Sequence, residues 1–404
     1  MRKSLFRSLG PGLLFAGAAI GVSHLVQSTK AGGLYGMGLI WALVLIHVIK
    51  YPFFQFGPRF TAATGKSLLE GYNEIGKFSL VLYLIINLVN MFTIQAAVTI
   101  VTAGILSSLF PDLFSLSAWA AIISFIGALI LIAGKYKALD RIIKYVIILL
   151  SVTTIFALGL AIEGNHRDFS FEQIIPSDLI GITFLISFLG WMPAPLDISV
   201  WHSLWAKEHK KNGVNEALFD FNVGYVGTLF LGLCFLLLGA LVMYHSGMGF
   251  SDSAALFASQ FIELYTNSIG NWAFYIIGVA AFATMFSTTL TTLDASPRVM
   301  DSISFLLFGV QSKNLYLILL VSLVVGTQAL IVYAGSSMLF LIKIATLLSF
   351  LTAPFFAIMN LYLIKSKYTP KQNQPGLMMT IYSSVGIIFL IAFSLYYIYF
   401  LSQY

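Results

Sequence analysis

The 404-residue sequence has few charged residues. Only 9% of its residues are Asp, Glu, Lys or Arg, whereas 59% are hydrophobic. Soluble domains carry about 25% charged residues, so this chain has too few to cover a water-exposed surface of its size. The shortage excludes a string of soluble domains and predicts an integral membrane protein that resides in the lipid bilayer.

Cysteine and enzyme motifs are also scarce. Cys234 is the only cysteine and lies in an apolar run, so no intrachain disulfide can form. The sequence has no phosphate-binding loop, no dinucleotide-binding glycine turn, no HExxH zinc motif and no Cys–His pair. These absences predict a protein that is not an enzyme and that carries no cofactor.

Long apolar runs, in contrast, fill most of the chain. A spanning helix needs about 20 mostly apolar residues, and these runs lack the alternation of barrel strands. We predict an all-α membrane protein with eleven transmembrane helices, forming a single transporter domain over 1–404. The predicted spans are about 11–32, 36–57, 78–109, 115–134, 142–162, 178–205, 217–245, 268–293, 314–334, 337–364 and 377–401.

The basic residues predict the orientation of these helices. All but four of the 22 Lys and Arg residues lie in loops on the side of the N-terminus or in the N-terminal segment itself; the exceptions are Lys30, Lys50, Arg167 and Lys343. Loops rich in Lys and Arg stay in the cytoplasm. We therefore expect a cytoplasmic N-terminus, an outside C-terminus and a place in the cell membrane. The net charge of +6 reflects this topology and predicts no nucleic-acid partner.

The N-terminal segment has features of a secretory signal peptide. It combines the basic Arg2, Lys3 and Arg7 with an apolar run and the small residues Ala16 to Ala18. The basic loops between the other ten helices fall on one side of the membrane only when this helix is counted as a span. We therefore expect it to be retained as the first span.

Two spans are interrupted at matching positions. Span 1 contains Gly10-Pro11-Gly12 and, at mid-depth, Gly21-Val22-Ser23-His24, and span 6 contains Gly190 to Pro195. Irregular backbone inside a membrane is tolerated only where it is buried in protein or lines a cavity. The matching breaks divide the chain into two five-helix repeats, about 9–162 and 178–364, followed by an extra helix at about 377–401. Repeats with broken helices predict a secondary transporter whose substrate site lies at the midplane of the bilayer. Simple packing kinks are the other explanation.

Three side chains near these breaks are candidate ligands. The His24 imidazole can ligate a metal or hydrogen-bond a substrate, or it can simply bond to a carbonyl. The Met192 thioether favours softer transition metals over Ca²⁺ and Mg²⁺, although methionine in apolar helices also serves packing. Asp197 is the only carboxylate near either break. It could ligate a cation, accept a proton or cap backbone donors.

Four further residues are candidates for binding a coupling ion. Ser287 and Thr288 could supply hard oxygens from span 8, or bond to carbonyls one turn back. Asp294 lies four residues before Arg298, and an interfacial ion pair explains it more simply. Lys343 lies inside span 10. Its ammonium either reaches the outer interface, pairs with a buried carboxylate or fills a cation site itself.

The residues at the breaks resemble the Nramp family of proton-coupled divalent metal transporters. The matching segments are Gly10-Pro11-Gly12, Ala31-Gly32, Gly36, Leu39-Ile40-Trp41, Met192-Pro193, Ser287-Thr288 and Phe350 to Phe355. The resemblance runs through helices 1 to 10 in order. It implies two inverted five-helix repeats of the kind shared with amino-acid/polyamine carriers.

The sequence departs from this family at the metal ligands. The family's Asp-Pro-Gly-Asn of helix 1 reads Gly21-Val22-Ser23-His24 here, and the family's His two positions after the methionine is Ala194. Helix 3 around Met91–Gln95 also lacks the acidic residues of the family's proton route. Of the ligands that the resemblance implies, only Met192 is present.

Two transport functions and one non-transport function remain open. The first is a manganese- or iron-type carrier with Gly21, Ser23, His24, Met192 and Asp197 at its substrate site, of which His24, Met192 and Asp197 bind the metal. The second is a sodium- or proton-coupled carrier of a small organic solute such as an amino acid, held at the helix ends that the breaks expose. The third is a sensor or an assembly scaffold.

Overall fold

The computed structural model describes residues 10–134, 136–163, 170–209, 213–244, 251, 253–310, 312 and 314–403. Within these residues the chain is helical and contains no strand. The helices are α2 (Pro11–Ala19), the π-helix η2 (Ser23–Ser28), α3 (Thr29–Tyr35), α4 (Ile40–Thr64), α5 (Leu68–Ile75), α6 (Lys77–Leu109), α7 (Leu116–Ile132), α8 (Tyr136–Glu163), α9 (Leu179–Trp191), α10 (Ile198–Glu208), α11 (Val214–Val242), α12 (Ala254–Ile269), the 3₁₀ turn η3 (Asn271–Ala273), α13 (Phe274–Phe308), α14 (Leu315–Tyr333), α15 (Met338–Lys365), the 3₁₀ turn η4 (Lys371–Asn373) and α16 (Leu377–Leu401).

The predicted spans coincide with these helices. Seven described helices are long and apolar enough to cross a membrane by themselves, and the bent pair Pro11–Ala19 and Ser23–Tyr35 makes an eighth. Three shorter apolar helices, Leu116–Ile132, Ile148–Glu163 and Leu179–Trp191, occupy the other predicted ranges. The prediction of an all-α membrane protein is confirmed.

The helix that follows the second break was predicted as part of one long span. The structure instead divides 178–205 into α9 and α10, with the segment from Met192 to Asp197 between them. Two helices outside the predicted spans, α5 and α12, lie in the connections. Both are short and partly polar, so the search for apolar runs does not detect them.

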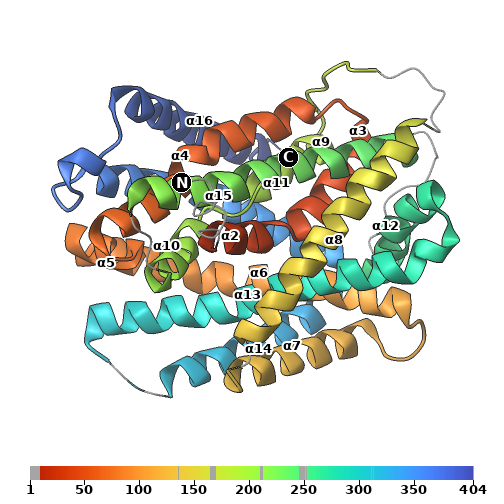
Figure 1. The fold of residues 1–404 in the computed structure, drawn as a ribbon, viewed down its shortest axis with the longest axis horizontal. Helices are drawn as coiled ribbons and strands as arrows, with labels where there is room; N and C mark the ends of the chain where they lie inside the picture. The colour runs from red at the N-terminus through yellow and green to blue at the C-terminus, as the bar shows by residue number, and fades with distance from the viewer. Residues whose placement is uncertain are drawn as a thin grey trace.

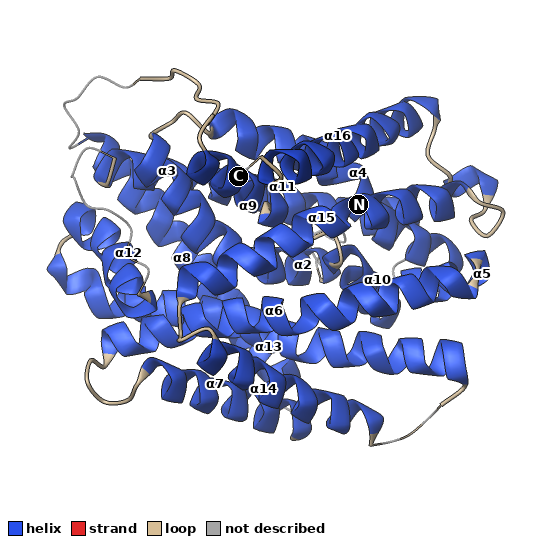
Figure 2. Cartoon of the chain, turned by 180° about the vertical axis from the view of Figure 1, so that it is seen from behind, coloured by secondary structure: helices blue, strands red, loops and turns tan. Residues whose placement is uncertain are grey.

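The broken first helix lies near the middle of the molecule. Figures 1 and 2 show α2 there, with α16 along one edge and α7 and α14 along the opposite edge. The helices α2 and α3 both pack against α11. This central position places the first break among buried protein groups, as irregular backbone at membrane depth requires.

Asp220 of α11 fixes the start of α2. Its Oδ1 accepts a hydrogen bond from the Gly10 amide at 2.9 Å, and its Oδ2 accepts one from the Gly12 amide at 3.0 Å. The first amides of a helix have no partner within the helix, and a carboxylate also suits the positive end of the helix dipole. A residue more than 200 positions away in the sequence therefore caps this helix.

The short helix α5 is tied to the end of α10. Ser67 and Glu70 form a capping box at the start of α5, and Lys207 Nζ donates to Glu70 Oε2 at 2.7 Å. Partial burial acts to raise the pKa of Glu70, but the hydrogen bonds from Lys207 and Ser67 outweigh it, so this pKa lies below its ordinary value. The pair joins the second half of broken helix 6 to a connecting helix.

The orientation in the membrane and the limits of the repeats stay predictions. Arg2, Lys3, Arg7 and Arg167 lie outside the described residues. The orientation therefore still rests on the distribution of basic residues in the sequence. The repeat limits, about 9–162 and 178–364, likewise rest on the spacing of the two breaks.

The contact between α2 and α11 depends on Gly224. A Cβ added at Gly224 would lie 2.1 Å from the Gly12 carbonyl oxygen, whereas one added at Gly227 of the same helix would meet nothing within 4 Å. We expect Gly224→Ala to lower the unfolding free energy by about 1–3 kcal/mol, as overpacking does. Gly227→Ala, the matched control, should be neutral or slightly stabilising. Thermal denaturation of the purified variants in detergent measures both, and equal melting temperatures would contradict the close approach.

Candidate functional site

The first break separates α2 from the π-helix η2. The last regular bond of α2 runs from the Ile20 amide to the Ala16 carbonyl at 2.8 Å, and the next bond is irregular, because the Gly21 amide donates to the Ala19 carbonyl, only two residues back, at 2.9 Å. The two helix halves meet at 47°. Because Gly21 lacks a side chain, the chain can turn here against its neighbours.

His24 is held beside this break by both ring nitrogens. Its Nε2 lies 2.9 Å from the Thr228 carbonyl oxygen, and its Nδ1 lies 2.7 Å from Ser23 Oγ and 3.1 Å from the Ala19 carbonyl oxygen. A neutral ring carries one proton and a carbonyl only accepts; we assign the proton to Nε2, whose contact with a carbonyl is the shorter, so that Nδ1 is an acceptor. Ser23 Oγ also donates to the Ala19 carbonyl at 2.6 Å. Nδ1 therefore points toward the break.

The second break exposes carbonyl groups, and a lysine from another helix binds them. Lys50 of α4 is fully buried, and its Nζ donates to the Gly190 carbonyl at 2.7 Å and to the Ala194 carbonyl at 3.2 Å. Pro193 and Pro195 have no amide proton, so the segment cannot close regular helical bonds. The Lys50 ammonium thus acts as a cation built into the break.

Met192 and His24 lie next to each other. Both are fully buried, and a carbon placed at the Cβ position of Gly232 would lie 3.0 Å from Met192 Cε and 3.7 Å from His24 Cδ2. Ser28 Oγ donates to Met192 Sδ at 3.6 Å. The structure therefore brings together the two predicted ligands that carry sulfur and nitrogen.

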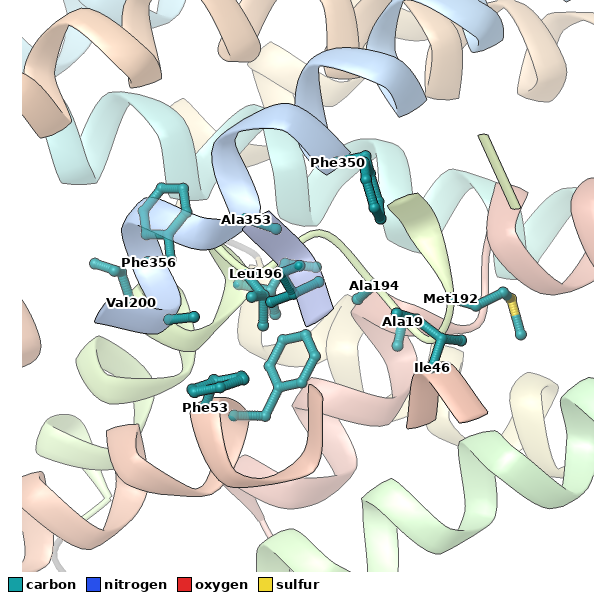
Figure 3. Packing of buried hydrophobic residues seen from close by; sticks show 14 of the residues in the cluster. Ala19, Ile46, Phe53, Met192, Ala194, Leu196, Val200, Phe350, Ala353 and Phe356 are labelled. Carbon is teal, nitrogen blue, oxygen red and sulfur yellow. The ribbon is translucent and has the colours of Figure 1, made fainter. Parts of the chain in front are cut away.

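A cavity of about 30 Å³ lies between the two breaks. Ala19 from the first break and Ala194 from the second both line it, and Figure 3 shows these two residues near each other, with the Met192 side chain directed away from Leu196. The hydroxyl-bearing residues Ser23, Thr288 and Thr292 also line it. A cavity needs about 10–15 Å³ to hold one water, so this space suits a small ion.

Gly21 packs directly against helix α13. A Cβ at Gly21 would lie 2.8 Å from Thr288 Oγ1 and 2.9 Å from Thr288 Cγ2. Thr288 Oγ1 donates to the Gly17 carbonyl at 3.5 Å and to the Thr284 carbonyl at 3.3 Å. The Thr288 side chain thus takes the space that a larger residue at position 21 would occupy.

Asp197 follows the second break. It is buried at the start of α10, makes no capping bond there, and its Oδ1 has no hydrogen-bond partner among the described residues. Its charge acts on Lys50 and on Tyr83. The structure therefore associates this carboxylate with the lysine at the second break.

The hydroxyls of α13 form a polar seam with α6. Thr289 Oγ1 lies 2.8 Å from Thr102 Oγ1, and Thr292 Oγ1 donates to Gln95 Oε1 at 2.5 Å. Thr291 Oγ1 donates to the carbonyl of Ser287, one turn back. Several hydroxyls in this run therefore serve helix packing, while Thr288 and Thr292 also reach the cavity.

Of the four candidates for a coupling ion, only Thr288 lines this cavity; Ser287, Asp294 and Lys343 do not. Asp294 accepts hydrogen bonds from Arg298 Nε at 2.8 Å, from Arg298 Nη2 at 3.0 Å and from Tyr316 Oη at 2.6 Å. It is thus part of an ion pair on its own helix. Lys343 is exposed and lines a second, larger cavity.

Sequence reasoning assigned no role to Lys50 and did not find the contact of Asp220 with α2. Lys50 is the only charged residue in the predicted span 36–57, and that signal marks it as unusual. Nothing in the sequence indicates its partners. In the described part of the chain, no group of three or more His, Cys, Asp or Glu residues could hold a metal ion. Any metal here must therefore use hydroxyl, carbonyl or thioether ligands as well.

A sequence profile described as natural resistance-associated macrophage protein-like, Nramp, matches residues 12–400. The chain belongs to the Nramp family. An uncharacterized protein of Pasteurella multocida (strain Pm70) is 33% identical over 405 residues, which cover 98% of this chain and 92% of the relative. Membership in this family makes the chain an integral membrane protein of a transporter family.

Solved structures of other transporters share the fold of this Nramp-family chain. A mutant of the Eremococcus coleocola manganese transporter superposes with a TM-score of 0.75 at 14% identity, covering 97% of this chain and 86% of that one. MhsT in complex with L-phenylalanine gives a TM-score of 0.63 at 14% identity, covering 95% and 98%. These likenesses confirm the predicted repeat fold with broken helices 1 and 6.

Removing the built-in cation should destabilise the second break. Lys50→Ala leaves the Gly190 and Ala194 carbonyls without a donor and Asp197 without its counter-charge, which we expect to lower the unfolding free energy by about 3 kcal/mol. Methylammonium at millimolar concentration should partly restore the melting temperature of this variant, because it can refill the vacated space. Lys66→Ala, at an exposed ion pair, is the control and should change little. An unchanged melting temperature for Lys50→Ala would contradict this role.

Proposed function

We propose that this protein is a secondary active transporter of divalent metal ions of the manganese or iron type, with its site at the breaks of helices 1 and 6. The single observation that carries the proposal is the cavity between the breaks. At about 30 Å³ it has room for an ion and not for an amino acid. The manganese transporter with the same fold supports the same class of substrate.

The ligands would come from both breaks. Ser23 and Thr288 line the cavity and would supply hydroxyl oxygens beside the backbone near Gly21. Met192 and His24 lie beside the breaks but do not line the cavity, so the thioether and Nδ1 would reach the ion only after their side chains turn toward it. A thioether with an imidazole suits a transition metal better than Ca²⁺ or Mg²⁺. Ser23 must turn away from His24 for Nδ1 to bind the ion. The neighbouring positions of Met192 and His24 support this set.

Charge near the site comes from Asp197 and Lys50. The family's helix-1 carboxylate is absent at Gly21, and Thr288 occupies the adjacent space. Asp197 is the buried carboxylate close to the second break, and its Oδ1 lacks a partner in the described structure. We propose that an entering metal ion displaces the Lys50 ammonium from the carbonyls of Gly190 and Ala194, to which it donates in this structure, and that Asp197 offsets the charge of the metal. This exchange would couple the filling of the site to the conformation of helix 6.

Transport would proceed by alternating access. One five-helix repeat rocks against the other around the fixed midplane site, opening it first to one side and then to the other. Ser287 and Thr288 remain candidates for a coupling ion, because Thr288 borders the cavity. The N-terminus would face the cytoplasm in the cell membrane.

Replacing the thioether tests the proposed site. Met192→Leu preserves volume and removes sulfur, so we expect at least a tenfold weaker apparent affinity for Mn²⁺ and a larger loss for the softer Cd²⁺. Uptake of each metal into proteoliposomes and calorimetric titration of the purified protein measure this effect. The control is Met285→Leu, at a fully buried methionine of α13 that lies outside both breaks. Absence of Mn²⁺ binding to the wild type at millimolar concentration, or equal affinities in the two variants, would overturn the proposal.

A further inference from the structure

A second cavity, of about 240 Å³, lies away from the metal site proposed above. It is enclosed by the second half of broken helix 1, by α9 and by the first turns of α15. Lys30 and Lys343 both line it, together with the uncharged polar residues Gln27, Thr183 and Ser187. None of the described lining residues is acidic. The cavity therefore holds positive charge and hydrogen-bonding groups of both kinds.

The N-terminus of α15 adds to the positive potential, whereas the N-terminus of α9 is capped by the carboxylate of Asp178. α9 begins at Leu179 and α15 at Met338, and both first turns border the cavity. Helix N-termini carry partial positive charge and favour anions nearby. The closest acidic residue in the sequence, Asp178, caps α9 by accepting from the Gly181 amide at 3.1 Å. It does not line the cavity.

The remaining wall of the cavity is apolar. Phe184 forms part of it and stacks on Tyr35, with ring centroids 5.7 Å apart, and on Phe188, with centroids 6.1 Å apart. A rigid aromatic face beside two ammonium groups suits a ligand with an apolar body and an anionic head. An inorganic anion would leave that face without a contact.

A divalent cation would not be stabilised in this cavity. Two ammonium groups repel it, and with apolar walls around them the repulsion is less screened than in water. The charges therefore serve a different ligand from the metal.

We propose that this cavity is a binding site for a small organic carboxylate. The carboxylate lies between Lys30 and Lys343, Gln27 and Thr183 donate hydrogen bonds to it, and the apolar part of the ligand packs on Phe184. The proposal does not depend on metal transport.

Benzoate and its neutral isostere benzamide test the site. In calorimetric titrations of the full-length protein in detergent, at constant ionic strength and without metal, we expect benzoate to bind at least tenfold more tightly than benzamide. Lys343→Gln should weaken benzoate binding at least tenfold. The control is Lys365→Gln, at an exposed lysine at the far end of α15.

Equal binding of benzoate and benzamide, or equal effects of the two lysine variants, would overturn the proposal. Phe184→Ala provides a second variant and should weaken benzoate binding with Lys343 intact. If the protein binds benzoate but takes up no metal, the proposal of metal transport is contradicted and the carboxylate site is supported. If the protein takes up metal but does not bind benzoate, the carboxylate site is contradicted and the proposal of metal transport is not.

Discussion

The structure depends on how the backbone groups freed by two broken helices are satisfied inside a membrane. Lipid offers no hydrogen bonds, so each freed carbonyl needs a partner from the protein. At the first break Ser23 donates to the Ala19 carbonyl, and Thr288 reaches the Gly17 carbonyl from α13. At the second break the Lys50 ammonium binds two carbonyls at once. These bonds hold the two breaks facing each other.

The same bonds decide what the space between the breaks can accept. Thr288 stands where a side chain on Gly21 would lie, so the first break presents hydroxyl and carbonyl oxygens but no carboxylate. Lys50 brings a positive charge, and Asp197 is the buried acid whose charge acts on it. A cation entering this site must therefore compete with a cation that the protein already carries. That competition provides a physical link between binding and the conformation of helix 6.

Local sequence signals predicted much of this arrangement. Apolar runs located the helices, Gly and Pro located the breaks, and the four-residue spacing of Asp294 and Arg298 suggested their ion pair, which the structure confirms. Contacts between segments that are distant in the sequence could not be predicted. Lys50 meets a carbonyl 140 residues away, and Asp220 caps a helix 208 residues before it. No periodicity or spacing encodes such pairs, because tertiary packing alone brings them together.

The placement of the candidate ligands was likewise predictable from the sequence only in part. Position at a break predicted His24 and Met192 as ligands of one site, and the structure places both side chains beside Gly232. Position at a break did not indicate that the charge of Asp197 acts on Lys50, because Lys50 comes from α4, which is distant in the sequence. The most direct measurement of the central claim is an electron cryomicroscopy map of the full-length protein saturated with Mn²⁺. We predict metal density in the cavity between the breaks, in contact with Ser23 and Thr288, with the Met192 and His24 side chains turned toward it; saturating Mn²⁺ bound elsewhere, with that cavity empty, would contradict the proposed site.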